Sequence, residues 1–180
     1  MFLGSYTVVL AFGSLFCNNV YMEKIKIAFF GHRDIYITDD QREQLKTTVS
    51  HLIDSYAFAE FYFGGYGRFD HDAYDCMREV AAACRCKCKF CYVLPYIYPK
   101  YLLRHSPPDG MYDELVYLGS ENIPPKIAII DRNKKIVNIC DMIIFAVTRT
   151  HGGAYQTLKY AERKHIAHIN LATNFITRLL

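Results

Sequence analysis

The sequence predicts an α/β fold: a three-layer, Rossmann-like domain with a mostly parallel sheet and helices on both faces. Short β-type runs alternate with amphipathic helical segments, as in right-handed βαβ crossovers. One run, Met142–Val147, is almost continuously apolar, which is typical of a strand buried on both faces. Polar or glycine-rich loops also follow several of the runs, where ligands of such sheets bind.

The composition supports a globular protein. Of the 180 residues, 52% are hydrophobic and 22% are charged, which excludes a disordered chain, collagen and a coiled coil. The net charge of +3 is too small to argue for nucleic acid or a membrane by itself.

Residues 1–21 differ from the remainder because they contain no charged side chain. They lack the basic start and the cleavage site of a secretory signal, and Gly and Ser interrupt the apolar run. We therefore expect residues 1–21 to be a leader outside the domain, either an upstream extension or a weakly hydrophobic segment, and dispensable. The domain is expected to span residues 22–180, with no membrane partner.

The seven cysteines indicate a reducing compartment, because their number is odd and four of them are crowded into eight residues. We interpret them as free thiols of a cytoplasmic protein. Zinc is the alternative for Cys84, Cys86, Cys88 and Cys91, but the first three would share one face of a strand and Cys91 would point away. No metal and no cofactor are expected.

The first half of the domain shows three strands and two helices. Ile25–Phe30 and Glu60–Phe63 are β-type runs, and Phe90–Leu94 is a third. Thr38 followed by Gln41 predicts a capping box at the first helix. Asp70 is expected to cap the second helix.

The second half is less regular. Pro95–Pro125 is expected to wander, with one short strand in Tyr112–Leu118. Lys126–Cys140 fits either a hairpin or a helix. Beyond the apolar strand 142–147, the sequence predicts a helix that runs to Lys164 and a last strand, Ile166–Leu171. The strands at 25–30 and 142–147 are expected near the centre of the sheet, not at an edge.

Three loops carry the functional signal: Gly31–Arg33, Gly64–Arg68 and Thr148–Gly153. Glycine turns before helices offer bare N–H groups and the positive end of a helix dipole, which bind phosphate. Arg33, Arg68 and Arg132 could add charge. Glycines that merely serve tight turns are the alternative for each loop.

Several motifs resemble the SLOG superfamily, the Rossmann-like group that includes DprA/Smf, LOG and YpsA-like proteins. They are IAFFGHR (27–33), FYFGGYGRFD (61–70), Arg132-Asn133, DMIIFAVT (141–148) and HGGA (151–154). The resemblance covers about residues 22 to 172 and favours a helix for Lys126–Cys140. It implies a sheet whose glycine-rich loops bind nucleotides or nucleotide-derived ligands.

The LOG enzymes of this group cleave the glycosidic bond of cytokinin nucleotides with the motif Pro-Gly-Gly-x-Gly-Thr-x-x-Glu. Aligned at Gly152-Gly153, this chain has Lys159 in place of the glutamate. The departure argues against LOG-type hydrolysis. We therefore expect a binding protein, a sensor or a processing protein, and leave enzymatic activity open. The expected site residues are Gly31, His32, Arg33, Gly64, Gly65, Gly67, Arg68, Asp70, Arg132, Asn133, Thr148, Gly152 and Gly153.

Two other functions stay open at this point. Residues 84–106 contain five basic residues, no acid and interleaved tyrosines, which also suits single-stranded nucleic acid as in the DprA branch. A nucleotide glycosidic-bond hydrolase would need a carboxylate, for which Asp70 and Asp72 are the candidates. The expected partner is a nucleotide-derived small molecule, ahead of nucleic acid; a homo-oligomer is a further option.

Overall fold

A parallel six-stranded sheet forms the centre of the computed structural model, which describes residues 22–119 and 123–172. The strand order is β4-β3-β2-β1-β5-β6, and every neighbouring pair is parallel. The strands are β1 (Met22–Gly31), β2 (Tyr56–Phe63), β3 (Lys87–Leu94), β4 (Glu114–Tyr117), β5 (Met142–Ala146) and β6 (Ala167–Asn170). The helices are α1 (Asp39–Ile53), α2 (Arg68–Ala83), α3 (Pro99–His105), α4 (Pro125–Ile139) and α5 (Gly153–Arg163).

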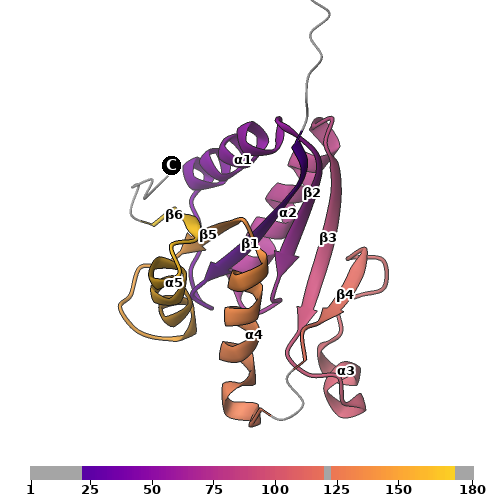
Figure 1. The fold of residues 1–180 in the computed structure, drawn as a ribbon, viewed down its shortest axis with the longest axis vertical. Coiled ribbons are helices and arrows are strands. Elements are labelled where there is room, and N and C mark those ends of the chain that lie inside the picture. The colour runs from indigo at the N-terminus through magenta and orange to yellow at the C-terminus, as the bar shows by residue number, and fades with distance from the viewer. Residues whose placement is uncertain (1–21, 120–122, 173–180) are drawn as a thin grey trace, which may run out of the picture.

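Helices cover both faces of this sheet, so the three-layer prediction is confirmed (Figure 1). Alternate residues of each strand enter two separate cores. Phe29, Phe61 and Ile144 pack with α1 and α2 on one face. Ala28 and Phe145 pack with α4 and α5 on the other face. The predicted central strands, β1 and β5, lie side by side within the sheet.

The predictions for the helix starts in the first half of the chain are confirmed with one exception. The capping box forms: Thr38 Oγ1 accepts the Gln41 N–H at 3.2 Å, and Gln41 Oε1 accepts the Thr38 N–H at 3.0 Å. The prediction that Asp70 caps α2 is wrong. The N-cap is Gly67, whose φ of 103° suits glycine, and Asp70 lies three residues into the helix.

In the second half, the ambiguous segment is the helix α4, so the hairpin alternative is wrong. The expected short strand is present as β4. Inside the proline-rich segment, the sequence analysis missed α3, a seven-residue helix that begins with Pro99.

The remaining expectations concern the chain ends and the cysteines. The leader lies outside the described residues, and the domain bounds stay a prediction. None of the described helices combines the length and the apolar character that a membrane span requires. Cys91 belongs to the core beneath α4 and α5, whereas Cys88 packs against the opposite core. Within the described ranges, no group of three or more potential metal ligands is found.

Candidate functional site

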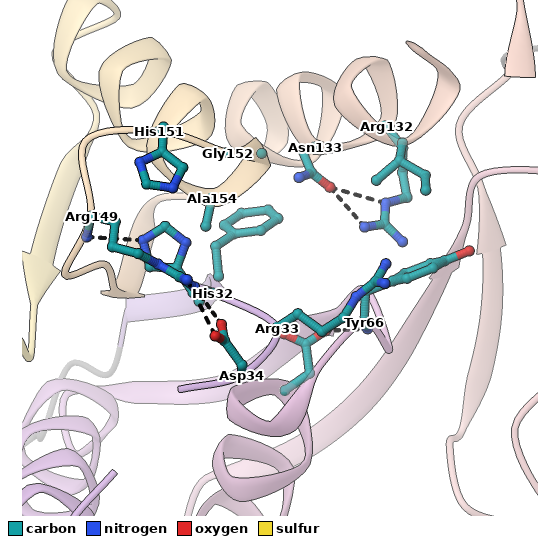
Figure 2. A pocket seen from close by; sticks show the side chains of 15 residues that line it. His32, Arg33, Asp34, Tyr66, Arg132, Asn133, Arg149, His151, Gly152 and Ala154 are labelled. Atoms are coloured by element: carbon teal, nitrogen blue, oxygen red, sulfur yellow. Dashed lines mark hydrogen bonds and ion pairs between the residues drawn. The ribbon is translucent and has the colours of Figure 1, made fainter. Parts of the chain in front are cut away.

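A cavity of about 310 Å³, which we call the main cavity, opens at the carboxyl ends of β1 and β5. Figure 2 shows the loops after these strands facing the helices α4 and α5 across it. This is the sheet edge at which parallel α/β proteins bind ligands. Its lining residues are Phe30, Gly31, His32, Arg33, Asp34, Tyr66, Asp70, Ile129, Arg132, Asn133, Arg149, His151, Gly152, Gly153 and Ala154.

The amino terminus of α5 contributes open backbone amides to the main cavity. Its N-cap is Gly152, which has a φ of 89° and no side chain with which to cap the helix. The first intrahelical bond is the one from the Gln156 N–H to the Gly152 carbonyl, at 3.0 Å. The N–H groups of Gly153 and Ala154 therefore have no intrahelical acceptor, and they lie at the positive end of the helix dipole.

His32 lies beside this helix end as a neutral donor. Its ring is buried, and its Nε2 accepts the backbone N–H of Arg149 at 3.1 Å. Burial and the charge of Arg149 lower the pKa of His32. The neutral ring therefore carries its proton on Nδ1, and a Cβ placed on Gly152 would lie 3.9 Å from that nitrogen.

The cationic side chains of the main cavity differ in how they are paired. Arg149 forms an ion pair with Asp34, which lowers the pKa of that carboxyl group. Arg132 is buried; burial lowers its pKa, and the negative charge of Asp70 opposes that shift. The guanidinium of Arg33 is exposed and has no hydrogen bond or ion pair with any described residue. Arg33 is thus the cation that an anionic ligand can engage without displacing a partner.

The second glycine loop, Gly64–Gly67, is closed by the protein itself. The Asp70 carboxylate accepts the N–H groups of Gly64 and Tyr66, both at 3.1 Å. Burial raises the pKa of Asp70 to about 6, while the charge of Arg132 and the loop amides oppose this shift. These amides are already occupied, so the loop does not offer them to a phosphate.

Two glycines of this loop are needed because the backbone is left-handed and other atoms pack closely against it. Gly65 has a φ of 69°, and a Cβ there would lie 2.2 Å from Tyr92 Cε2. A Cβ on Gly67, whose φ is also positive, would lie 2.5 Å from the Arg33 Cα. Gly153 differs, because its backbone is unstrained and a Cβ would meet no atom within 4 Å.

A chain of buried hydrogen bonds connects the closed loop to α5. Arg132 Nη1 donates to the Gly64 carbonyl at 2.8 Å, and its Nη2 donates to Asn133 Oδ1 at 2.7 Å. Asn133 Nδ2 donates to Thr157 Oγ1 at 3.1 Å. The Thr157 hydroxyl donates to the Gly153 carbonyl at 2.8 Å. Arg132 and Asn133 therefore fix the position of the helix terminus.

The main cavity brings together most of the residues expected from the sequence, but not all of them. Eight line it: Gly31, His32, Arg33, Asp70, Arg132, Asn133, Gly152 and Gly153. Gly64, Gly65, Gly67, Arg68 and Thr148 do not. Arg68 instead pairs with Asp72 at 3.1 Å and lies over the Tyr36 ring.

Sequence reasoning did not select Tyr66, Asp34, Arg149, His151 and Ala154, among other lining residues. Arg149 and His151 lie within the predicted loop Thr148–Gly153, but a loop sequence does not say which side chains point inward. Tyr66 lies between glycines that had drawn attention to its loop.

The position of the LOG glutamate carries no catalytic group. Lys159 lies on α5, forms an ion pair with Glu162 and does not line the main cavity. Of the two candidate acids, Asp70 is occupied by the loop amides and Asp72 is paired with Arg42 and Arg68.

The basic segment 84–106 does not form one surface. Arg85 and Lys87 lie at the amino end of β3. Lys100 and Arg104 lie on α3, which follows the carboxyl end of β3. Lys89 pairs with Glu114 at 2.6 Å. Tyr92 is a buried core residue.

Comparisons with known proteins agree with this fold. No protein-family model and no curated protein matches the sequence. Among solved structures, DNA processing protein A from Helicobacter pylori matches with a TM-score of 0.53 and 18% identity, over 80% of this chain and 63% of that one. That structure was described for its single-stranded DNA binding mode.

Two further structures complete the comparison. DprA from Streptococcus pneumoniae matches with a TM-score of 0.53 and 16% identity, over 80% of this chain and 49% of that one. The Moco carrier protein from Chlamydomonas reinhardtii matches with a TM-score of 0.47 and 12% identity, over 83% and 76% of the two chains. This chain thus spans less than two thirds of either DprA structure, and it has the Rossmann-like α/β fold that its resemblance to the SLOG superfamily implies.

Proposed function

We propose that the protein binds a phosphorylated nucleoside derivative whose phosphate lies at the amino terminus of α5. The observation that carries the proposal is the convergence of three donors on one cavity: the open amides of Gly153 and Ala154, the Nδ1–H of His32 and the unpaired guanidinium of Arg33. Anions bind at helix amino termini because free N–H groups and the dipole act together.

The size of the main cavity suits the sugar and the phosphate of a nucleotide. Its volume of about 310 Å³ is at the lower end of the range for small-molecule sites, roughly 300–1,000 Å³. The ring of Tyr66 supplies an aromatic wall. The family that the sequence resembles binds nucleotide-derived ligands at such loops. The proposal is limited to binding, because the two described carboxylates that line the cavity are engaged: Asp34 pairs with Arg149, and Asp70 accepts the loop amides.

Calorimetric titration with nucleoside 5′-monophosphates tests this function. Arg33→Ala should weaken binding by about 1.5–3 kcal/mol if the guanidinium bonds to the ligand. Gly153→Val should also weaken it, because it adds bulk in open space where the backbone tolerates a side chain. Arg68→Ala is the matched control, since Arg68 is also exposed and lies outside the cavity. Unchanged affinity in both site variants would contradict the proposal.

Single-stranded nucleic acid is the second candidate ligand. The observation in its favour is that a structural neighbour, the Helicobacter pylori DprA, was described in terms of single-stranded DNA binding. A phosphate of a strand would use the same donors at α5. A gel-shift assay with a single-stranded oligonucleotide tests this candidate, and no shift at low salt would remove it.

A further inference from the structure

A second cavity of about 280 Å³ adjoins the main cavity, and Tyr66 lines both of them. We call it the tyrosine cavity, because the side chains of Tyr66, Tyr92 and Tyr112 contribute to its lining. They come from the loop after β2, from β3 and from the segment before β4. His71 and Arg104 also line it.

The tyrosine rings are held in place before any ligand arrives. The hydroxyl of Tyr66 is hydrogen-bonded to that of Tyr101, and Arg132 lies over the Tyr66 ring, 5.3 Å from its centroid. The Tyr92 hydroxyl donates to the His105 carbonyl at 3.2 Å. The Tyr92 and Tyr112 ring centroids are 5.1 Å apart. Rings fixed in this way lose little freedom when a flat ligand stacks on them.

Two exposed nitrogen-bearing side chains line the tyrosine cavity beside its aromatic rings. Arg104 and His71 are exposed, and neither forms a hydrogen bond or an ion pair with the described part of the chain. No carboxylate side chain lines the cavity. Aromatic walls combined with an unpaired arginine are typical of sites where nucleobases stack.

The size of the tyrosine cavity suits a base better than a complete nucleotide. Its volume lies just below the roughly 300–1,000 Å³ of sites that enclose a complete small molecule. It also shares a wall with the cavity that holds the phosphate donors. We propose that the tyrosine cavity takes a nucleobase whose phosphate, or whose neighbour's phosphate, is bound at α5. The proposal rests on the proposed function and adds the subsite that recognises the base.

Three probes with matched chemistry test the proposal by calorimetric titration of the full-length protein. Deoxyribose 5-phosphate carries the phosphate without a base, dAMP adds one adenine, and the dinucleotide pdAdA adds a second. The test variants are His71→Ala and Arg104→Gln. Lys100→Gln is the control, because Lys100 is exposed on the same helix as Arg104 and does not line the cavity.

We expect His71→Ala and Arg104→Gln each to weaken binding of a base-containing probe by about fivefold, or roughly 1 kcal/mol, because each variant removes a side chain that would contact the base. Deoxyribose 5-phosphate should bind these variants and the wild type equally. If the variants weaken dAMP binding, the base in the tyrosine cavity belongs to the nucleotide whose phosphate is bound at α5. If they weaken only pdAdA binding, it belongs to the neighbouring nucleotide.

If both variants bind dAMP and pdAdA as tightly as the wild type, the base subsite is wrong. It is also wrong if Lys100→Gln loses as much affinity for these probes as the test variants do. The phosphate site is judged separately with Arg33→Ala and deoxyribose 5-phosphate. If Arg33→Ala leaves that affinity unchanged while Arg104→Gln weakens dAMP, the phosphate site is wrong and the base subsite stands. Failure of the wild type to bind any of the three probes would overturn both.

Discussion

Replacing Asp70 with alanine is expected to destabilise the protein by about 3–5 kcal/mol, because this carboxylate shapes the loop Gly64–Gly67. Its Oδ2 accepts the N–H groups of Gly64 and Tyr66. A hydrogen bond to a charged group contributes about 1.5–3 kcal/mol, so the two bonds give about 3 kcal/mol at the low end. The buried guanidinium of Arg132 would also lose the negative charge of Asp70, which favours its charged form, and this adds to the cost.

Urea unfolding followed by far-ultraviolet circular dichroism measures this loss, since the chain has no Trp. Asp75→Ala is the control, because Asp75 is exposed on the same helix and its removal should change the stability by less than about 0.5 kcal/mol. The double variant Asp70→Asn/Arg132→Met should be less destabilised than the sum of the single variants, because neither buried charge is then left alone. If Asp70→Ala unfolds at the same urea concentration as Asp75→Ala, the carboxylate does not hold the loop and the reasoning fails.

Three further predictions concern stability. Burial raises the pKa of Asp70 from 3.8 to about 6, so the native state keeps this proton to a higher pH than the unfolded chain. Relative to Asp70→Asn, the wild type should therefore lose stability as the pH rises from about 4 to about 6, because only its side chain gives up a proton in that range, and a constant difference would contradict this. The two loop hydrogen bonds do not depend on this proton, because Oδ2 accepts them in either protonation state. Gly65→Ala should lower the melting temperature, because the left-handed backbone costs about 1–2 kcal/mol and the new Cβ collides with Tyr92, whereas Gly153→Ala should melt at or above the wild-type temperature. Thr38→Ala should cost about 1 kcal/mol in urea unfolding through loss of the capping box, and an unchanged midpoint would show that the box adds nothing.

The arrangement of the sheet was predictable because burial leaves a direct record in the sequence. The continuous apolar run of β5 and the alternation of strands with helices were enough to place β1 and β5 inside the sheet, with a neighbouring strand on each side. The helix α3 was missed because seven residues between prolines give no periodic pattern. For α4, the residues alone fitted two structures, and the resemblance decided correctly.

The site could be predicted as a set of loops but not as a set of donors. Gly64–Gly67 and Gly152–Gly153 look equivalent in the sequence. Only the fold shows that Asp70 reaches back to occupy the first loop, while nothing caps the second. Arg132 contacts Gly64 across 68 positions of the chain, and no local pattern reveals such a bond. Arg132 was predicted to bind the ligand, but its hydrogen bonds position the amino terminus of α5 through Asn133 and Thr157.

A titration of the ¹⁵N-labelled protein with deoxyribose 5-phosphate, followed through the backbone amide resonances, tests the central claim most directly. The account predicts that the amides of Gly153 and Ala154 shift most, because they lie open at the amino terminus of α5. The amides of Gly64 and Tyr66 should stay nearly unchanged, because Asp70 already accepts their hydrogen bonds. Large shifts at Gly64 and Tyr66, with Gly153 and Ala154 unmoved, would contradict it.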